Sequence, residues 1–404
     1  MDQGRRSLVE RLSGRNLDLA LSVNTSFGPG AASRTGGTAR EAGSRRAFIV
    51  TDPGIVASGA VEPVLDSLRR ADLPAEVFDG VAPNPSDGEV LGGSERLGEF
   101  GLAGTVVVAV GGGSALDAAK AISLHAANGG AVADLDYRYA PEKPGLPVIA
   151  LPTTAGTGSE TNSFGVITSG ESGRKFYVGH ASVGPRACLL DPELTTGLPS
   201  AATAATGIDA LSHALEATMS VSANPYADAL ALGVARTVNA WLPVAVERGD
   251  DLEARSQMLL AAHLAGLAFA SGTGLGLGHA LAHPVGARLG APHGAALAAV
   301  LPAVMEFNLP EKAHKLAPLA GALGAGGDLP EEVAAKEAIR RVEELIGRVL
   351  GDGLTKYTVS ERDLDVLVRD TLDDGVISNT PRLPSESEVR KLLVSTLLEV
   401  GDRS

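Results

Sequence analysis

The types and spacing of Asp209 and His213 would allow these two residues to hold one metal ion. They lie four positions apart in a stretch of helical character, and this spacing projects both side chains from one face of a helix. Carboxylate oxygen and imidazole nitrogen are ligands of divalent transition metals. The pair therefore predicts one side of a metal site.

Three further candidate ligands follow in one short segment, although the chain has only 8 histidines in all. They are His279, His283 and His293. Each alone is better explained as an ordinary core or surface histidine, but together with the first pair they favour a site for Fe(II), Zn or another divalent metal, with positions left open for substrate oxygen. Pro284 and Gly294 directly follow two of these histidines and predict shaped loops rather than continuous helix.

A glycine-rich segment, Gly111-Gly112-Gly113-Ser114, lies between a predicted strand at 105–110 and a predicted helix at 115–128. Glycines let a diphosphate approach the backbone, and the start of the helix offers unpaired N–H groups and the positive end of its dipole. The segment lacks the last glycine of the common dinucleotide fingerprint. A simple turn would explain one or two glycines, so three followed by serine favour phosphate binding.

Two other polar segments also follow predicted strands. Asp52 comes after the strand at 47–50, where a carboxylate can accept hydrogen bonds from a ribose and would repel a 2′-phosphate, which favours NAD over NADP. Asp52-Pro53-Gly54 is equally an ordinary turn sequence, so both interpretations stand. The segment 151–160 carries hydroxyls and glycines that suit a second wall of a nucleotide site.

The elements that must position these residues fall into two halves. In the first half, short apolar runs alternate with amphipathic ones, which predicts an α/β domain with a parallel, nucleotide-binding sheet. Its predicted strands are 47–50, 75–78, 105–110 and 148–151, with helices at 63–71, 89–100 and 115–128. The second half has long helical stretches and predicts an all-α metal-binding domain, with helices at 201–241, 251–269, 333–350, 361–372 and 386–400. The predicted organisation is a polar extension at 1–23, an α/β domain at 24–197 and a helical domain at 198–404.

Composition excludes several classes of protein. A chain of 404 residues with 44% hydrophobic and 20% charged residues fits two folded domains and not a disordered chain. The net charge of −14 argues against a general nucleic-acid binder. The single cysteine, Cys188, is predicted to be inert and indicates a reducing, cytoplasmic setting. No leader-like segment or long apolar window is apparent, so no membrane partner is expected.

Longer motifs resemble the iron-containing, group III alcohol dehydrogenases, whose fold is also that of dehydroquinate synthase. The resemblance runs from about Phe27 to the end of the chain. It is carried by GGGSALDAAK at 111–120, PTTAGTGSE at 152–160, GIDALSHALE at 207–216, GHALAHPVGARLGAPHG at 278–294 and NTPR at 379–382. These segments stand in the order and spacing of that family.

The resemblance implies roles for individual residues. The metal ligands would be Asp209, His213, His279 and His293, with His283 left unligated beside the nicotinamide as a proton relay. NAD would lie along Asp52, Gly112, Gly113, Ser114, Asp117, Thr153, Thr154, Thr157 and Lys175, and Asp117 is also a candidate catalytic residue. Fe(II) would be the metal, with Zn or another divalent ion as the alternative.

The segments expected around the substrate depart from the family pattern. Phe269–Gly274 is one residue longer than usual and rich in small side chains, and the segment 161–164 is more polar. The tentative substrate residues are Asn162, Phe164, Phe269 and Arg288. Arg174, Lys175 and Arg288 suggest an anionic aldehyde such as a carboxylate or phosphonate, although a solvated surface or cofactor contacts also explain these cations.

The expected function is hydride transfer between NAD(H) and a small primary alcohol or aldehyde. A transhydrogenase acting between a hydroxyacid and an oxoacid is an alternative, and so is a lyase that uses bound NAD as dehydroquinate synthase does. The GIDALSHALE and HPVGARLGAPHG segments argue against the lyase. A non-catalytic binding module would require a lost ligand, and none is lost. The resemblance also implies a homodimer or larger homo-oligomer, with a strand near 22–28 that could pair across a two-fold axis.

Overall fold

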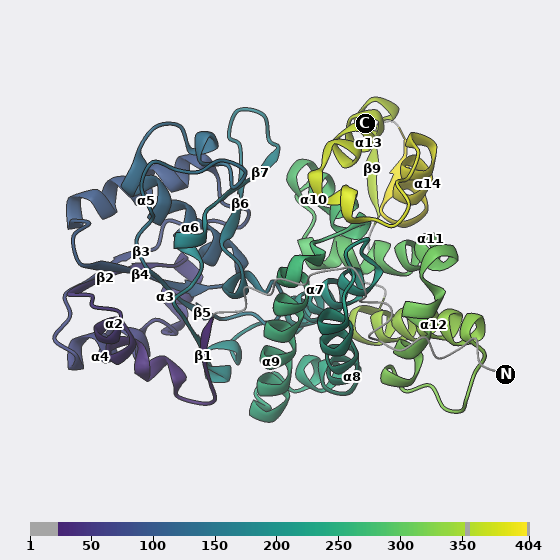
Figure 1. Cartoon of the computed structure of the whole chain (residues 1–404), viewed down its shortest axis with the longest axis horizontal. Coiled ribbons are helices and arrows are strands. Elements are labelled where there is room, and N and C mark those ends of the chain that lie inside the picture. Colours follow the sequence, from purple (N-terminus) through teal and green to yellow (C-terminus); the bar gives the residue numbers. More distant parts are fainter. Residues whose placement is uncertain (1–22, 352–355, 402–404) are drawn as a thin grey trace.

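A six-stranded parallel sheet forms the centre of the first half of the chain (Figure 1). The computed structural model describes residues 23–351 and 356–401, so the predicted extension at 1–23 lies outside them except for Val23. In the order β1-β8-β5-β4-β2-β3, the strands are Asn24–Phe27, Ala187–Leu190, Val148–Pro152, Thr105–Gly111, Arg46–Val50 and Ala75–Phe78. Every pairing is parallel, which confirms the predicted α/β sheet.

Helices cover both faces of this sheet, and the strand residues alternate between them. On β2, Phe48 and Val50 pack in a cluster with side chains of α5 (Asp87–Phe100) and α6 (Gly113–Asn128). The intervening Ala47 and Ile49 pack in a second cluster with α2 (Thr35–Glu41) and α4 (Glu62–Arg70). Burial on both faces explains why β4 is an almost unbroken valine run that ends at the glycine turn.

An antiparallel hairpin that the sequence analysis does not predict projects from the sheet domain toward the helical half (Figure 1). Its strands are β6 (Phe164–Thr168) and β7 (Lys175–Gly179). Gly165 allows close packing on α6, because a Cβ there would lie 2.4 Å from the carbonyl oxygen of Asp117. The hairpin carries two of the predicted site residues, Phe164 and Lys175.

The second half is helical, as predicted. Its helices are α7 (Ser200–Met219), α8 (Pro225–Glu247), α9 (Leu252–Ala268), α10 (Leu277–Leu289), α11 (His293–Ala322), α12 (Glu331–Leu350), α13 (Glu361–Asp373) and α14 (Glu386–Thr396). The predicted helix at 201–241 is in fact two helices, because Asn224 caps α8 and Pro225 starts it. The last predicted helix also ends early, since Leu398–Val400 forms β10 and pairs with β9 (Tyr357–Val359).

The histidine-rich segment is helical, so the prediction of loops there was wrong. His279 and His283 lie inside α10, which continues through Pro284, and His293 is the first residue of α11. A proline removes one backbone hydrogen bond, but residues 277–286 are all buried, and tertiary packing holds the helix together.

By length and composition, α8 could cross a membrane, and the bent pair Leu252–Thr273 with Leu277–Leu289 passes the same test together. Core helices of globular proteins pass it too. Side chains of α8 such as Val234, Val238 and Leu242 are fully buried in the main helical cluster. Their burial favours a core helix.

Candidate active site

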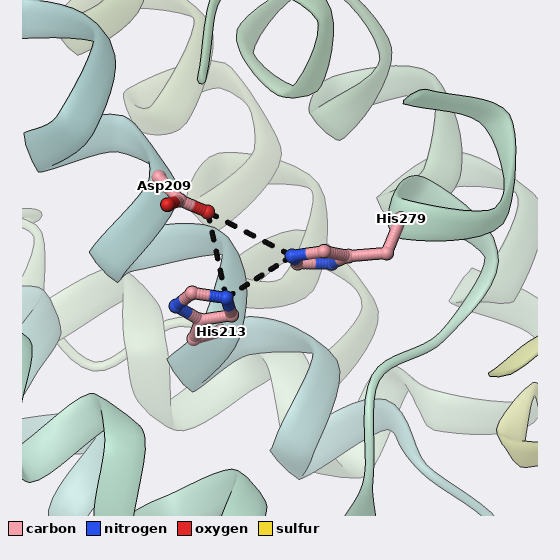
Figure 2. A group of neighbouring side chains, drawn as sticks. All are labelled: Asp209, His213 and His279. Carbon is pink, nitrogen blue, oxygen red and sulfur yellow. Dashed lines mark hydrogen bonds and ion pairs between the residues drawn. The ribbon is translucent and has the colours of Figure 1, made fainter. Parts of the chain in front are cut away.

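Three of the predicted metal ligands converge from two helices (Figure 2). Asp209 and His213 project from one face of α7, and His279 points at them from α10. The Nε2 atoms of His213 and His279 lie 3.1 Å apart, and they lie 3.4 and 3.7 Å from Oδ1 of Asp209. All three side chains are buried.

The fourth predicted ligand, His293, approaches from the start of α11. Its Nε2 lies 3.9 Å from Oδ1 of Asp209, and its side chain is 30% exposed. The next residue, Gly294, packs against α7 so closely that a Cβ would lie 2.2 Å from the carbonyl oxygen of Ala205. This glycine is needed to bring His293 to the other three residues.

The cluster fits a divalent ion. Oδ1 of Asp209 is a buried acceptor without a hydrogen-bond partner among the described residues, which is rare for a carboxylate. A tetrahedral ion with bonds of about 2.1 Å separates its ligand atoms by about 3.4 Å, close to the spacings found here. Burial alone would raise the pKa of Asp209, but the neighbouring imidazoles hold it well below its usual range. Burial also lowers the pKa of His213 and of His293, so both rings favour the neutral form that metals bind.

His283 lies beside the cluster and has a partner that the sequence analysis missed. Its ring is stacked on that of His293, with centroids 5.5 Å apart. Its Nδ1 lies 2.7 Å from Oδ2 of Asp374, which follows α13. Because a carboxylate accepts, Nδ1–H donates, and Nε2 is the nitrogen left to exchange a proton with a ligand.

One cleft of about 1020 Å³ brings the two predicted half-sites together. Its lining includes all four predicted metal ligands and His283. It also includes every predicted cofactor residue: Asp52, Gly112, Gly113, Ser114, Asp117, Thr153, Thr154, Thr157 and Lys175. We call this the inner cleft.

The glycine turn packs directly on the threonine wall of the inner cleft. A Cβ on Gly113 would lie 2.7 Å from Cγ2 of Thr157, and one on Gly112 would lie 3.1 Å from Cγ2 of Thr154. Gly112 is the N-cap of α6, and no side chain caps the first N–H groups of that helix. The first residues of the helix, Gly113 and Ser114, line the inner cleft. This geometry suits a diphosphate.

Asp52 and Asp117, the two acidic residues of the predicted cofactor site, already accept hydrogen bonds from other residues of the chain. Oδ1 of Asp52 caps α3 (Pro53–Ser58) by accepting the N–H groups of Gly54 and Ile55, while the residue still lines the inner cleft. Asp117 accepts from Ser159 Oγ at 2.5 Å and from the N–H of Val166 at 2.9 Å. These bonds join α6 to the turn at Ser159–Thr161 and to β6 of the hairpin. A catalytic role for Asp117 stays a prediction.

A second cleft, of about 1120 Å³, adjoins the first. This outer cleft shares Asn162, Phe164, Lys175, Phe269, Leu275 and His283 with the inner cleft. Phe269–Thr273 forms a π-helical turn, a geometry that accommodates one extra residue and is frequent at functional sites.

The two arginines of the outer cleft that were expected near the substrate are ion-paired. Arg288 bonds Asp370 at 2.5 Å, and Arg174 lies 3.4 Å from Asp373. Their charge is therefore compensated. The ammonium group of Lys175, by contrast, makes no hydrogen bond or ion pair with the described part of the chain, and burial lowers its pKa. The substrate role of these residues stays a prediction.

Comparisons with known proteins show which family the chain resembles. The profile of the family "Iron-containing alcohol dehydrogenase" matches residues 22–192, and that of "Fe-containing alcohol dehydrogenase family, C-terminal" matches residues 203–397. The chain is 36% identical over 373 residues to an NAD-dependent methanol dehydrogenase of Bacillus methanolicus, covering 92% of this chain and 97% of that protein.

Solved structures give the same answer. A 1,3-propanediol oxidoreductase has a TM-score of 0.86 and 36% identity, over 94% of this chain and 100% of the other. A sulfoacetaldehyde reductase from Bifidobacterium kashiwanohense in complex with NAD⁺ has a TM-score of 0.81 and 30% identity, over 95% and 99%. Family profiles match both halves of the chain, and side chains that could hold a metal ion converge between α7 and α10. The chain therefore belongs to the iron-containing alcohol dehydrogenases.

Proposed function

We propose that this NAD-linked alcohol dehydrogenase interconverts a small primary alcohol and its aldehyde in the inner cleft. The proposal rests on one observation: the inner cleft is lined both by the glycine turn and by the four candidate metal ligands. Asp209, His213, His279 and His293 would hold Fe(II) or another divalent ion, and the wall from Asp52 to Lys175 would hold NAD(H), with NADP disfavoured by Asp52.

The two bound groups would supply Lewis-acid stabilisation of the substrate oxygen and a hydride acceptor or donor. The chain's own residues do the rest. The cluster and the glycine turn align the two ligands, and the buried side chains around them exclude water. His283 exchanges a proton with the substrate oxygen through Nε2, while Asp374 holds the ring by Nδ1.

The outer cleft supports a proposal for the remainder of the substrate. An aldehyde whose oxygen lies at the metal cluster would extend past Phe164 and Phe269 into the outer cleft. Arg174 and Arg288 are paired with carboxylates, and the arginines of the outer cleft do not line the inner cleft. Lys175 lines both clefts, so it is the cation best placed to receive an anionic substituent. One relative of known structure is named as a sulfoacetaldehyde reductase, and an anionic aldehyde is the corresponding proposal here.

The decisive experiment is NADH oxidation by chelator-stripped protein, with and without added Fe(II) or Zn. The aldehyde panel would contain neutral, carboxylated and phosphonylated members of equal length. We expect turnover only with metal, and Lys175→Met should lower kcat/KM for anionic members more than for neutral ones. Turnover of a hydroxyacid and oxoacid pair without exchange of free NADH would instead favour the transhydrogenase.

Gly113→Ala should weaken NADH binding by at least about 10-fold, because the new methyl group would meet Thr157 and push the wall into the diphosphate position. Gly92→Ala in α5 is the matched control, since a Cβ there meets nothing within 4 Å. Fluorescence titration with NADH measures both variants. Equal affinity of Gly113→Ala and the native protein would place the diphosphate elsewhere.

We also propose a cytoplasmic homodimer. β1 is an edge strand of the described sheet and could pair with a second copy. Cys188 is buried in β8, and burial raises its thiol pKa well above the usual value, as suits an inert cysteine in a reducing compartment. Light scattering after gel filtration measures the mass, and a monomer would contradict this assembly.

A further inference from the structure

A buried carboxylate, Glu216, stands behind the metal cluster and belongs to neither the predicted ligands nor the cofactor wall. It follows His213 by three positions on α7 and is only 3% exposed. A glutamate this deep in a helical core is uncommon unless it is fully paired.

The start of α10 surrounds this carboxylate with donors. Oε1 accepts the N–H of Gly278 at 2.6 Å, and Oε2 accepts the N–H of Gly276 at 3.0 Å. The third donor is Nδ1 of His279, which lies 2.5 Å from Oε2. A Cβ on Gly278 would lie 2.8 Å from Oε1, so the glycine makes this close approach possible.

This arrangement determines which nitrogen of His279 can bind an ion. With Nδ1–H donated to Glu216, only Nε2 carries a free lone pair, and Nε2 faces Asp209 and His213. Ligand histidines are commonly oriented in this way by an outer carboxylate, which also increases the donor strength of the ring.

We propose that Glu216 is a positioning residue of the metal centre, which holds the His279 ring with Nε2 directed at the ion. This inference rests on the proposed metal-dependent function. It adds a residue that is not itself a proposed ligand. Glu216 lies on the same helix as Asp209 and His213 and bonds the helix that carries His279.

A simpler role would be structural, since Glu216 also caps the start of α10. The chain contains a matched pair that separates the two roles. Glu160 and His263 are both buried and joined at 3.1 Å between Oε1 and Nδ1, but His263 is not part of the metal cluster. Loss of either carboxylate should destabilise the fold, whereas only Glu216 should affect metal binding.

The test compares Glu216→Gln with Glu160→Gln in the full-length protein. The amide introduced by Glu216→Gln would place an NH₂ group against a ring of donors, so its partners could no longer all be satisfied. Competition with a chelator should show 10- to 100-fold weaker Co(II) binding for Glu216→Gln, the usual cost of losing such a partner. The visible spectrum of the Co(II) protein should change as well, whereas Glu160→Gln should keep the native affinity and spectrum.

Thermal unfolding of each variant fixes a temperature at which both are folded. If Glu216→Gln does not fold, Gly278→Ala replaces it, because the added methyl group displaces the carboxylate without removing it. Native Co(II) affinity and spectrum in the folded variant would overturn the proposal, as would an equal loss in Glu160→Gln. If the native protein binds no metal, the proposed function itself is overturned. That result differs from one in which the native protein binds metal and Glu216→Gln binds it equally well, which would overturn only the role of Glu216.

Discussion

His213→Ala should lose its metal and at least about 10³-fold in kcat/KM, while the fold and NADH affinity stay close to native. Nε2 of His213 lies 3.1 Å from Nε2 of His279 and 3.4 Å from Oδ1 of Asp209. Its loss removes the proposed ligand atom that lies between these two. Metal stabilisation of the substrate oxygen contributes several kcal/mol, and each 1.4 kcal/mol is a factor of ten in rate. NADH should still bind, because its proposed diphosphate site lies on the sheet domain.

Elemental analysis, NADH fluorescence and steady-state kinetics measure the three quantities separately. His125→Ala is the control, because this buried histidine bonds Ser94 and the carbonyl oxygen of Gly130 at the other end of α6. It should keep its metal and its turnover. Full activity of His213→Ala in metal-free buffer would contradict the assignment of this cluster.

The convergence of the candidate metal ligands could be predicted because their signal is local. Asp209 and His213 share one helical face whatever surrounds the helix, and histidine is rare enough for a cluster to be noticed. The glycine turn was equally visible, since a valine strand must end before the helix that follows. Both patterns depend on the local geometry of a helix or a strand, so they can be recognised in the sequence before the tertiary structure is known.

The partners behind the site could not be predicted, because each comes from a distant element. Asp374 lies 91 positions from His283, and Glu216 lies 63 positions from His279. Glu216 had one weak signal, its place on the same face of α7 as His213. The β6–β7 hairpin had a signal that the sequence analysis did not use: FGVIT at 164–168 and KFYVG at 175–179 are rich in β-branched and aromatic residues and flank the turn-like segment SGESGR. Pro284 led to a wrong prediction of a loop for a related reason. The burial of α10 outweighed the tendency of proline to interrupt a helix.

The second large effect is expected at His283. We predict that His283→Ala lowers kcat by about 10² to 10⁴-fold, the usual contribution of a positioned acid–base group. Metal content should stay native, because the ring contacts His279 and His293 but is not one of the four proposed ligands. Elemental analysis and single-turnover kinetics measure the two properties. Native kcat would show that a water molecule, and not this ring, carries the proton.

Asp374→Asn distinguishes the ring's own chemistry from its orientation. An amide can still bond Nδ1, but it accepts through one oxygen only and no longer carries the charge that stabilises a protonated ring. Its effect on kcat should therefore be smaller than that of His283→Ala, and the double variant should be no slower than His283→Ala alone. If Asp374 acts only through His283, removing Asp374 should cause no further loss once His283 is gone. Additive losses of kcat would therefore mean that Asp374 acts on the substrate by another route.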